Sequence, residues 1–245
     1  MRQLYETVKH LLIINGLFFF ATMALGPVVY DWFSLHYFAS PKFQPWQLLT
    51  HMFMHGDFGH IFFNMFGLYM FGTPLEQLWG RNKFIFFYLS TGFGAALLQM
   101  GIYYFQVQQG VMELEGLGMS SSAIQEFLQT SALSPTVMEQ ADIGNLRGAY
   151  QAYSAVLVGA SGALYGVLVG FAMLFPNAQL MLLFPPIPIR AKFLVPILIV
   201  VDLFFGFSSY SMGPIAHFAH VGGALTGLLM MWYWKRNQFN SNRWN

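Results

Sequence analysis

Charged side chains are missing from six long stretches of this sequence. Only 9% of the residues are charged and 56% are hydrophobic, whereas soluble domains contain about 25% charged residues. The uncharged stretches cover residues 10–30, 58–75, 84–112, 148–189, 193–201 and 203–234. A helix crosses a bilayer with about 20 apolar residues, and backbone polar groups must be satisfied internally there. The sequence therefore predicts an all-α polytopic membrane protein with six transmembrane helices.

Prolines and charges between the apolar residues set the expected helix boundaries. The stretch 148–189 holds one span and a loop, because several prolines interrupt its second half, and Asp202 interrupts the fifth span. The expected spans are residues 10–29, 58–75, 84–105, 161–175, 192–207 and 215–234. No small-residue cleavage site follows the first span, so we expect a retained helix rather than a signal peptide.

One membrane domain, residues 10–236, is expected between short tails at residues 1–9 and 237–245. Residues 106–150 are rich in Gln, Ser and Glu and form a polar outer insert, with an amphipathic helix at 124–133; this insert is a cap, a partner site or a passive loop. Residues 30–58 contain many aromatic side chains. Because such side chains favour the membrane interface, this first outer loop is expected to be membrane-associated.

The basic residues predict the orientation of the chain. If the N-terminus is cytoplasmic, nine of the eleven Lys and Arg residues lie on that side: Arg2, Lys9, Arg81, Lys83, Arg190, Lys192, Lys235, Arg236 and Arg243. Since basic residues favour cytoplasmic loops, both termini are expected to be cytoplasmic and the insert external. The expected location is a bacterial inner membrane.

One serine lies among glycines in the segment VGASGALYG, residues 158–166. If a helix begins at Ser161, the free N–H groups of its first turn point at the group that the hydroxyl would attack. Residues 161–175 span about 21 Å at 1.5 Å per residue, less than the roughly 30 Å hydrocarbon core. Ser161 is therefore expected below the outer surface, in a water-filled cavity. The alternative is an ordinary packing serine in a helix whose small residues recur every four positions.

A second glycine-rich segment, HFAHVGGALTG at residues 217–227, contains a histidine at the corresponding place. Gly223 and Gly227 form a face of small residues, which permits close helix packing, as does Gly162 on the first segment. Such packing would bring His220 Nε2 to Ser161 Oγ. A serine becomes a useful nucleophile only with a neighbouring base, so the two residues together indicate acyl-transfer chemistry.

Acyl transfer also needs hydrogen-bond donors for the oxyanion. His60 and Asn64 are four residues apart, hence on one helix face, and polar residues within a membrane segment are costly unless they are paired. With the backbone N–H of Ser161, they are the candidate donors; the alternative is a pair that only ties two helices together. His51 and His55 share the same spacing, but no acid completes a zinc-protease HExxH pattern, so no metal site is expected.

These motifs resemble those of the rhomboid family of intramembrane serine proteases. The matching residues are GASG around Ser161 with Tyr165 four residues later, Gly159 before the serine, AHVGGALTG around His220, HIFFN at residues 60–64, and Thr50, His51 and His55. One GxSG motif is weak evidence, but the set in this order is highly specific and covers most of the chain.

The resemblance implies a six-helix rhomboid-like bundle and a Ser–His dyad without an acid. It further implies hydrolysis of peptide bonds in or near transmembrane helices of membrane-protein substrates, within the lipid bilayer and without cofactor or metal. Tyr165 would stack on His220, and the fifth span would gate substrate entry. Two departures stand out: Trp46-Gln47 replaces the usual Trp-Arg pair, which puts the polar contacts of the first loop in doubt, and the insert is long.

Several other classes fit less well. A catalytically silent relative that binds and retains membrane proteins usually lacks the serine or the histidine, and a transporter would show inverted repeats, which we do not see. The absence of cysteine excludes disulfides and a thiol nucleophile. A net charge of +1 gives no case for nucleic acid, and without a second intramembrane acid an aspartyl protease is excluded.

Overall fold

The computed structural model describes residues 5–181, 187–208 and 215–237. The first four residues of the expected N-terminal tail, nearly all of the C-terminal tail and two prolines of the predicted 176–189 loop, Pro185 and Pro186, lie outside the described residues. The described chain is mainly helical, with two short two-stranded sheets.

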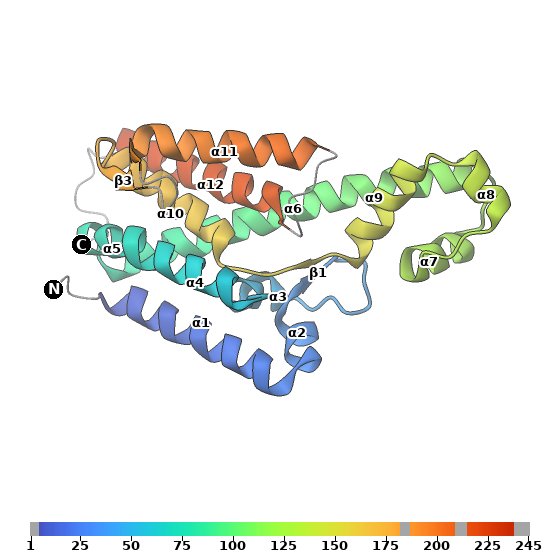
Figure 1. Cartoon of the computed structure of the whole chain (residues 1–245), viewed down its shortest axis with the longest axis horizontal. Coiled ribbons are helices and arrows are strands. Elements are labelled where there is room, and N and C mark those ends of the chain that lie inside the picture. Colours follow the sequence, from blue (N-terminus) through green and yellow to red (C-terminus); the bar gives the residue numbers. More distant parts are fainter. Residues whose placement is uncertain (1–4, 182–186, 209–214, 238–245) are drawn as a thin grey trace.

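Three helices pack directly on one another at the centre: α6 (Arg81–Gly116), α10 (Ser161–Leu174) and α12 (His217–Arg236), as Figure 1 shows. They meet through small residues. A β-carbon on Gly227 would lie 2.8 Å from the Cα of Gly166, and one on Gly222 would lie 2.8 Å from the carbonyl oxygen of Gly94. Membrane helices associate by such close packing, so the glycine faces hold the core together.

The remaining long helices surround this centre. They are α1 (Glu6–Leu25), the continuous run of α4 (Phe58–Gly67), the π-helical η2 (Leu68–Gly72) and α5 (Thr73–Trp79), and finally α11 (Ala191–Phe207). Buried Glu76 accepts hydrogen bonds of 2.8 Å from the backbone N–H groups of both Thr7 and Val8. Its carboxylate therefore caps the first turn of α1, where helix N–H groups lack partners and favour negative charge.

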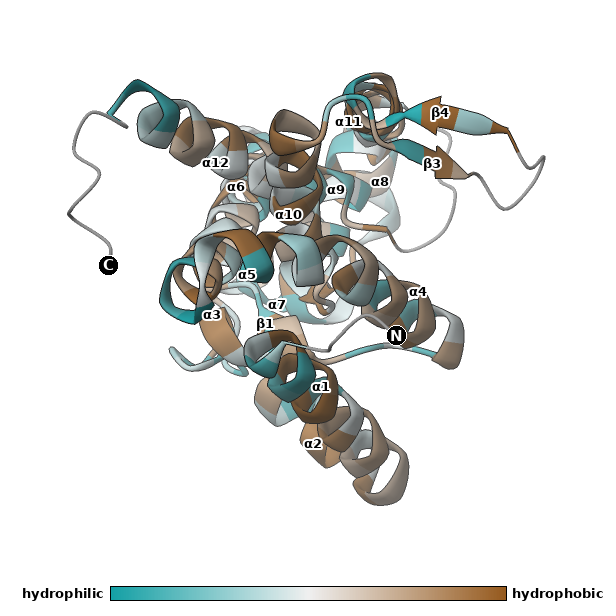
Figure 2. Ribbon diagram, turned by 90° about the vertical axis from the view of Figure 1, so that its left-hand side faces the viewer, coloured by the Kyte–Doolittle hydropathy of each residue, from teal (hydrophilic) through white to brown (hydrophobic). Residues whose placement is uncertain are grey.

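Apolar residues cover much of the outer surface of the bundle. Phe58, Phe62 and Phe66 are stacked along the exposed face of α4, and hydrophobic residues predominate along α1 and α4 in Figure 2. By length and composition, α1 and α6 could each cross a membrane, while α10 is a shorter apolar helix. The arrangement as six spans stays a prediction.

The expected helix positions agree with the structure at several boundaries. α10 begins at Ser161 and ends before Pro176, and α11 begins one residue before the predicted Lys192. The predicted loop between them contains a hairpin of β3 (Gln179–Met181) and β4 (Pro188–Arg190).

The helix that contains the predicted third span is longer than the span itself. α6 continues for eleven residues beyond Phe105, and α7 (Ser121–Thr130), α8 (Pro135–Gln140) and α9 (Ile143–Ser154) fold back along it. α9 packs closely on the extension, because a β-carbon on Gly110 would overlap Ala149. We call residues 106–154 the arm. It has its own apolar cluster, which includes Leu114, Phe127 and Leu146, so it is a helical unit rather than a polar loop (Figure 1).

The first outer loop contains α2 (Pro27–Phe33), β1 (Leu35–His36), α3 (Gln47–Thr50) and the 3₁₀ helix η1 (His51–Phe53). β1 pairs antiparallel with β2 (Val156–Leu157), just before α10. The fully buried Gln47 accepts hydrogen bonds from the backbone N–H groups of His36 and Gln44. Its amide donates to the carbonyls of Asp31 and Lys42. Gln47 therefore supplies the internal polar contacts that the sequence comparison with the family had left in doubt.

Candidate functional site

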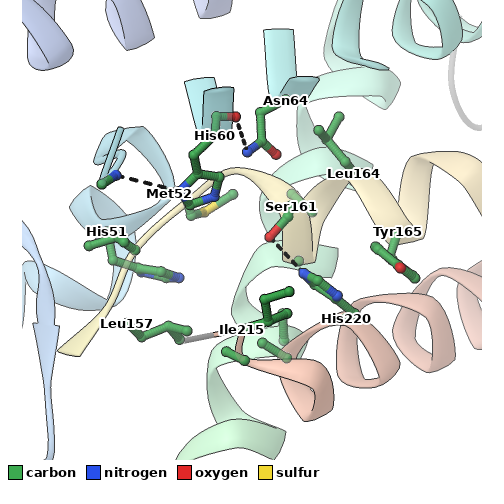
Figure 3. A pocket seen from close by; sticks show the side chains of 18 of the residues that line it. His51, Met52, His60, Asn64, Leu157, Ser161, Leu164, Tyr165, Ile215 and His220 are labelled. Atoms are coloured by element: carbon green, nitrogen blue, oxygen red, sulfur yellow. Dashed lines mark hydrogen bonds between the residues drawn. The ribbon is translucent and has the colours of Figure 1, made fainter. Parts of the chain in front are cut away.

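Ser161 and His220 are hydrogen-bonded to each other. Ser161 is the first residue of α10, and His220 lies one turn into α12. The Nε2 atom of His220 is 2.9 Å from the Oγ atom of Ser161, as the dashed line in Figure 3 shows. Both side chains are half-buried. This contact depends on the glycines, because a β-carbon on Gly223 would overlap the carbonyl oxygen of Gly162.

Tyr165 holds the plane of the His220 ring. It lies one turn after Ser161 on α10, and its ring stacks on the imidazole with 4.3 Å between the ring centroids and an interplanar angle of 8°. The imidazole is thus placed between the serine hydroxyl at one edge and a flat aromatic surface on one face (Figure 3).

Asp202 is the site residue that the sequence analysis missed. This buried residue of α11 has its Oδ1 atom 3.0 Å from Nδ1 of His220 and 2.7 Å from Nδ1 of His217. The resemblance implied a dyad without an acid; here a carboxylate lies behind the histidine. An acidic residue within a membrane segment normally has a polar or charged partner. Applied to Asp202, that rule could have suggested from the sequence that this carboxylate pairs with another side chain of the site.

His60, at the start of α4, directs one ring nitrogen toward Ser161. The backbone N–H of Gly56 donates to Nδ1 of His60 at 3.4 Å, so Nε2 carries the ring hydrogen. A β-carbon on Gly159 would lie 2.7 Å from this Nε2 and 3.6 Å from Ser161 Oγ. With a φ of +115°, Gly159 has a backbone conformation that side chains disfavour, and it leaves room for the imidazole beside the serine.

Asn64 lies one turn after His60 and lines the same cavity. Its Nδ2 donates to the carbonyl of His60 at 2.8 Å; since an amide nitrogen carries two hydrogens, one remains for a ligand. In Figure 3, His60 and Asn64 approach Ser161 from α4, while His220 approaches it from α12. The structure therefore brings the four predicted polar side chains around one point.

The cavity at this point has a volume of about 1460 Å³. Its lining comes from the first outer loop, α4, α6, the segment before α10, α10 itself, the beginning of α12 and the arm. The arm contributes Gln106, Gly148, Gln151 and Ala152. The arm therefore forms part of the wall of the cavity. The choice between a cap, a partner site and a passive loop stays as the sequence left it.

His51 and His55 do not lie on one helix. His51 lies in η1 and donates from Nδ1 to the carbonyl of Gln47 at 2.9 Å, whereas His55 follows in a segment without regular secondary structure. Burial lowers the pKa of His51 to about 4. Burial, with a smaller effect of nearby His60, lowers the pKa of His55 to about 4. Both are neutral, buried side chains of the first loop.

Among the residues that the structure describes, Asp202, His217 and His220 are the group that could surround a metal ion. Their separations of 2.7 and 3.0 Å are hydrogen-bond distances. Two ligand atoms at about 2.0–2.2 Å from one tetrahedral zinc lie more than about 3 Å apart. The geometry is that of a hydrogen-bonded cluster.

Comparison with known proteins places the chain in a family. The rhomboid domain model matches residues 42–237. The chain is 27% identical over 181 residues to "Rhomboid protein 1, mitochondrial" of Saccharomyces cerevisiae, covering 74% of this chain and 39% of that protein. It is 38% identical over 55 residues to "RHOMBOID-like protein 6, mitochondrial" of Arabidopsis thaliana, covering 22% and 18%.

The chain thus matches less than half the length of either relative. Both names say mitochondrial, so these relatives do not support the expected bacterial inner membrane. The matched range 42–237 includes α4, α6, α10, α11 and α12 and every site residue described above. The chain belongs to the rhomboid family of integral membrane proteins.

Proposed function

We propose that this protein is an intramembrane serine endopeptidase that cleaves transmembrane or juxtamembrane segments of membrane-protein substrates. The observation that carries the proposal is the 2.9 Å contact between Ser161 Oγ and His220 Nε2 inside a cavity. An isolated serine is a poor nucleophile, whereas one with a base in hydrogen-bond reach can be activated. Retention of this pair favours the peptidase over a silent binding relative.

In the proposed reaction, His220 Nε2 takes the proton of Ser161 as Oγ attacks the scissile carbonyl carbon. The tetrahedral intermediate collapses as the same nitrogen returns the proton to the leaving amine. A water molecule then attacks the acyl-enzyme with His220 again as base, which releases the second product and restores the serine. No cofactor or metal enters this sequence.

The negative charge that develops on the carbonyl oxygen would be stabilised from the α4 side. The donors are Nε2–H of His60, the free N–H of the Asn64 amide and the backbone N–H of Ser161. The first two reach the same cavity from neighbouring turns of one helix. Preorganised donors in a site that excludes bulk water act more strongly than the same groups in water.

We propose that α1, the α4–α5 run, α6, α10, α11 and α12 are the six spans. The start of α1 contacts α5 through Glu76, and the end of α12 contacts it through Trp234, whose ring centroid lies 5.5 Å from that of Trp79. Both ends of the domain are therefore at one end of the bundle, and the arm is at the other (Figure 1). This matches an even number of spans with cytoplasmic termini and an external arm.

Covalent labelling tests the nucleophile. Purified protein is treated with a fluorophosphonate, and the adduct is located by mass spectrometry. We expect labelling of Ser161 that is abolished in Ser161→Ala, nearly abolished in His220→Ala and unaffected by EDTA. Ser154→Ala is the matched control, since Ser154 is exposed and bonds only to backbone carbonyls in its own helix. A panel of single-span substrates then reports cleavage.

Undiminished labelling in His220→Ala would contradict the proposed base. An adduct on a serine other than Ser161 would contradict the nucleophile. An unlabelled wild type that still captures single-span proteins would favour the binding and retention relative.

A further inference from the structure

The carboxylate of Asp202 connects three side chains around the proposed base. Its Oδ1 atom accepts hydrogen bonds from Nδ1 of His220 and of His217. Tyr165, whose ring stacks on His220, interacts electrostatically with the same carboxylate. Three helices meet here, because Asp202 comes from α11, Tyr165 from α10 and the two histidines from α12.

This arrangement determines which nitrogen of His220 carries the hydrogen. An ionised carboxylate only accepts hydrogen bonds, and a neutral imidazole has one donor and one acceptor nitrogen. With Nδ1–H donating to Asp202, Nε2 has a free lone pair, and this is the nitrogen that lies 2.9 Å from Ser161 Oγ. The opposite tautomer would present N–H to the hydroxyl and could not accept its proton.

We propose that Asp202 is a positioning residue for His220, so that the site is a Ser161–His220–Asp202 chain of hydrogen bonds rather than a dyad. This inference rests on the proposed peptidase function. The carboxylate holds the imidazole in its proton-accepting tautomer and faces the positive charge that the ring gains when Ser161 loses its proton. His217, one turn before His220, donates a hydrogen bond to the same oxygen and so fixes the orientation of the carboxylate.

A purely structural tie between α11 and α12 explains the contact less well. A buried carboxylate costs free energy on desolvation, and well-packed apolar residues usually join helices equally well. The apolar surroundings of α11 offer such an alternative, since its other buried residues are Ala191 and Val195. The carboxylate also accepts from the one ring atom that sets the tautomer of the proposed base.

The decisive variant is Asp202→Asn, which keeps the shape but offers an amide N–H to Nδ1. In a serine protease with a buried aspartate, the same change lowers kcat about 10⁴-fold through the wrong tautomer. We expect a loss on the order of 10²–10⁴ in kcat and in the fluorophosphonate labelling rate, with KM nearly unchanged. The loss in His217→Gln should be smaller, because His220 keeps its own bond to Asp202.

Glu76→Gln is the matched control. Glu76 is also a buried acid, but it belongs to α5, where it accepts hydrogen bonds from the first turn of α1, and it does not line the cavity around Ser161. This change should lower the unfolding temperature without changing the labelling rate per folded molecule. Comparison at equal folded fraction separates a positioning role from loss of structure.

A second readout does not depend on activity. In protein with ¹⁵N-labelled histidine, long-range ¹H–¹⁵N correlation spectra distinguish the two tautomers, and His220→Gln assigns the signal. We expect the Nδ1–H form in the wild type and the Nε2–H form in Asp202→Asn. The groups that face Asp202 are Tyr165 on α10 and His217 and His220 on α12, with His60 across the cavity, so all variants are compared at one pH.

The outcomes are distinct. If the wild type is labelled and Asp202→Asn is labelled equally fast with an unchanged tautomer, the positioning role is wrong and the peptidase stands. If the wild type is not labelled, the proposed function fails, while the spectra still report whether Asp202 sets the tautomer. Loss of labelling on EDTA treatment with recovery on adding Zn²⁺ would make the cluster a metal site and would overturn the inference.

Discussion

The carbonyl oxygen of Gly162 occupies the position that a β-carbon on Gly223 would take. The backbones of α10 and α12 are therefore in direct contact one residue after Ser161 and three residues after His220. Any side chain at residue 223 would push the two helices apart, and with them the serine and the histidine. The distance between Ser161 Oγ and His220 Nε2 depends on this contact.

Gly223→Ala should consequently reduce both stability and activity. Overpacking of this kind costs about 1–3 kcal/mol and occasionally more, and the displacement should lower the Ser161 labelling rate even in molecules that remain folded. The control is Gly101→Ala in α6, where a β-carbon meets nothing within 4 Å and alanine favours a helix interior. Thermal unfolding in detergent measures the stability, and the fluorophosphonate labelling rate measures the activity of Ser161. Equal unfolding temperatures and labelling rates in the two variants would contradict the packing argument.

His60→Ala and Asn64→Ala should each lower kcat with little change in KM. Removal of one oxyanion donor typically costs 10²–10³-fold in kcat, and both side chains reach the cavity beside Ser161. His51→Ala is the comparison, since His51 is buried and bonds to the Gln47 carbonyl. His51→Ala should lower the free energy of unfolding, and its loss of kcat should be smaller than in His60→Ala or Asn64→Ala. An equal loss of kcat in all three variants would indicate a structural histidine cluster.

Stability should decrease as the pH falls from about 6.5 to about 4. His51 and His55 have a pKa near 4 in the folded protein because of burial, whereas an unfolded histidine titrates near 6.5. Below pH 6.5 the unfolded chain binds protons that the folded chain does not. Each histidine therefore lowers the free energy of unfolding by up to about 1.4 kcal/mol for each unit by which the pH falls. Below pH 4 this contribution levels off.

Unfolding in detergent across this pH range measures how steeply the free energy of unfolding changes with pH. His51→Gln should make this slope shallower, whereas His10→Gln, which changes an exposed histidine of α1, should leave it unchanged. A wild-type slope that His51→Gln does not alter would assign the acid sensitivity to other groups.

The proposed orientation can be tested with single cysteines, because the chain has none of its own. Glu139→Cys lies on the exposed surface of the arm, and Lys9→Cys and Lys235→Cys lie near the two ends of the domain. A membrane-impermeant maleimide added to sealed cells or vesicles should modify position 139 on the outer side and the other two only after permeabilisation. Modification of all three from the same side would overturn the six-span arrangement.

Local signals explain why some boundaries were predicted well. A glycine-flanked serine followed by apolar residues and then a proline placed α10, and Arg190 and Lys192 placed the start of α11. The amphipathic helix expected at residues 124–133 overlaps α7. The last eleven residues of α6 and the helices α8 and α9 were missed, because a helix can continue through Gln and Glu residues without any change that marks its end. Its length became clear only from the packing of α9 on Gly110.

The sequence by itself determined the family and the candidate nucleophile, base and oxyanion donors, because these residues lie in short motifs. The tertiary structure decided what lies behind the base. From sequence, Asp202 is a lone acid in an apolar helix that requires some partner, since an unpaired charge is costly there. Which partner it has depends on how α10, α11 and α12 pack, and their glycine contacts bring its carboxylate to His220 rather than to any neighbour along the chain.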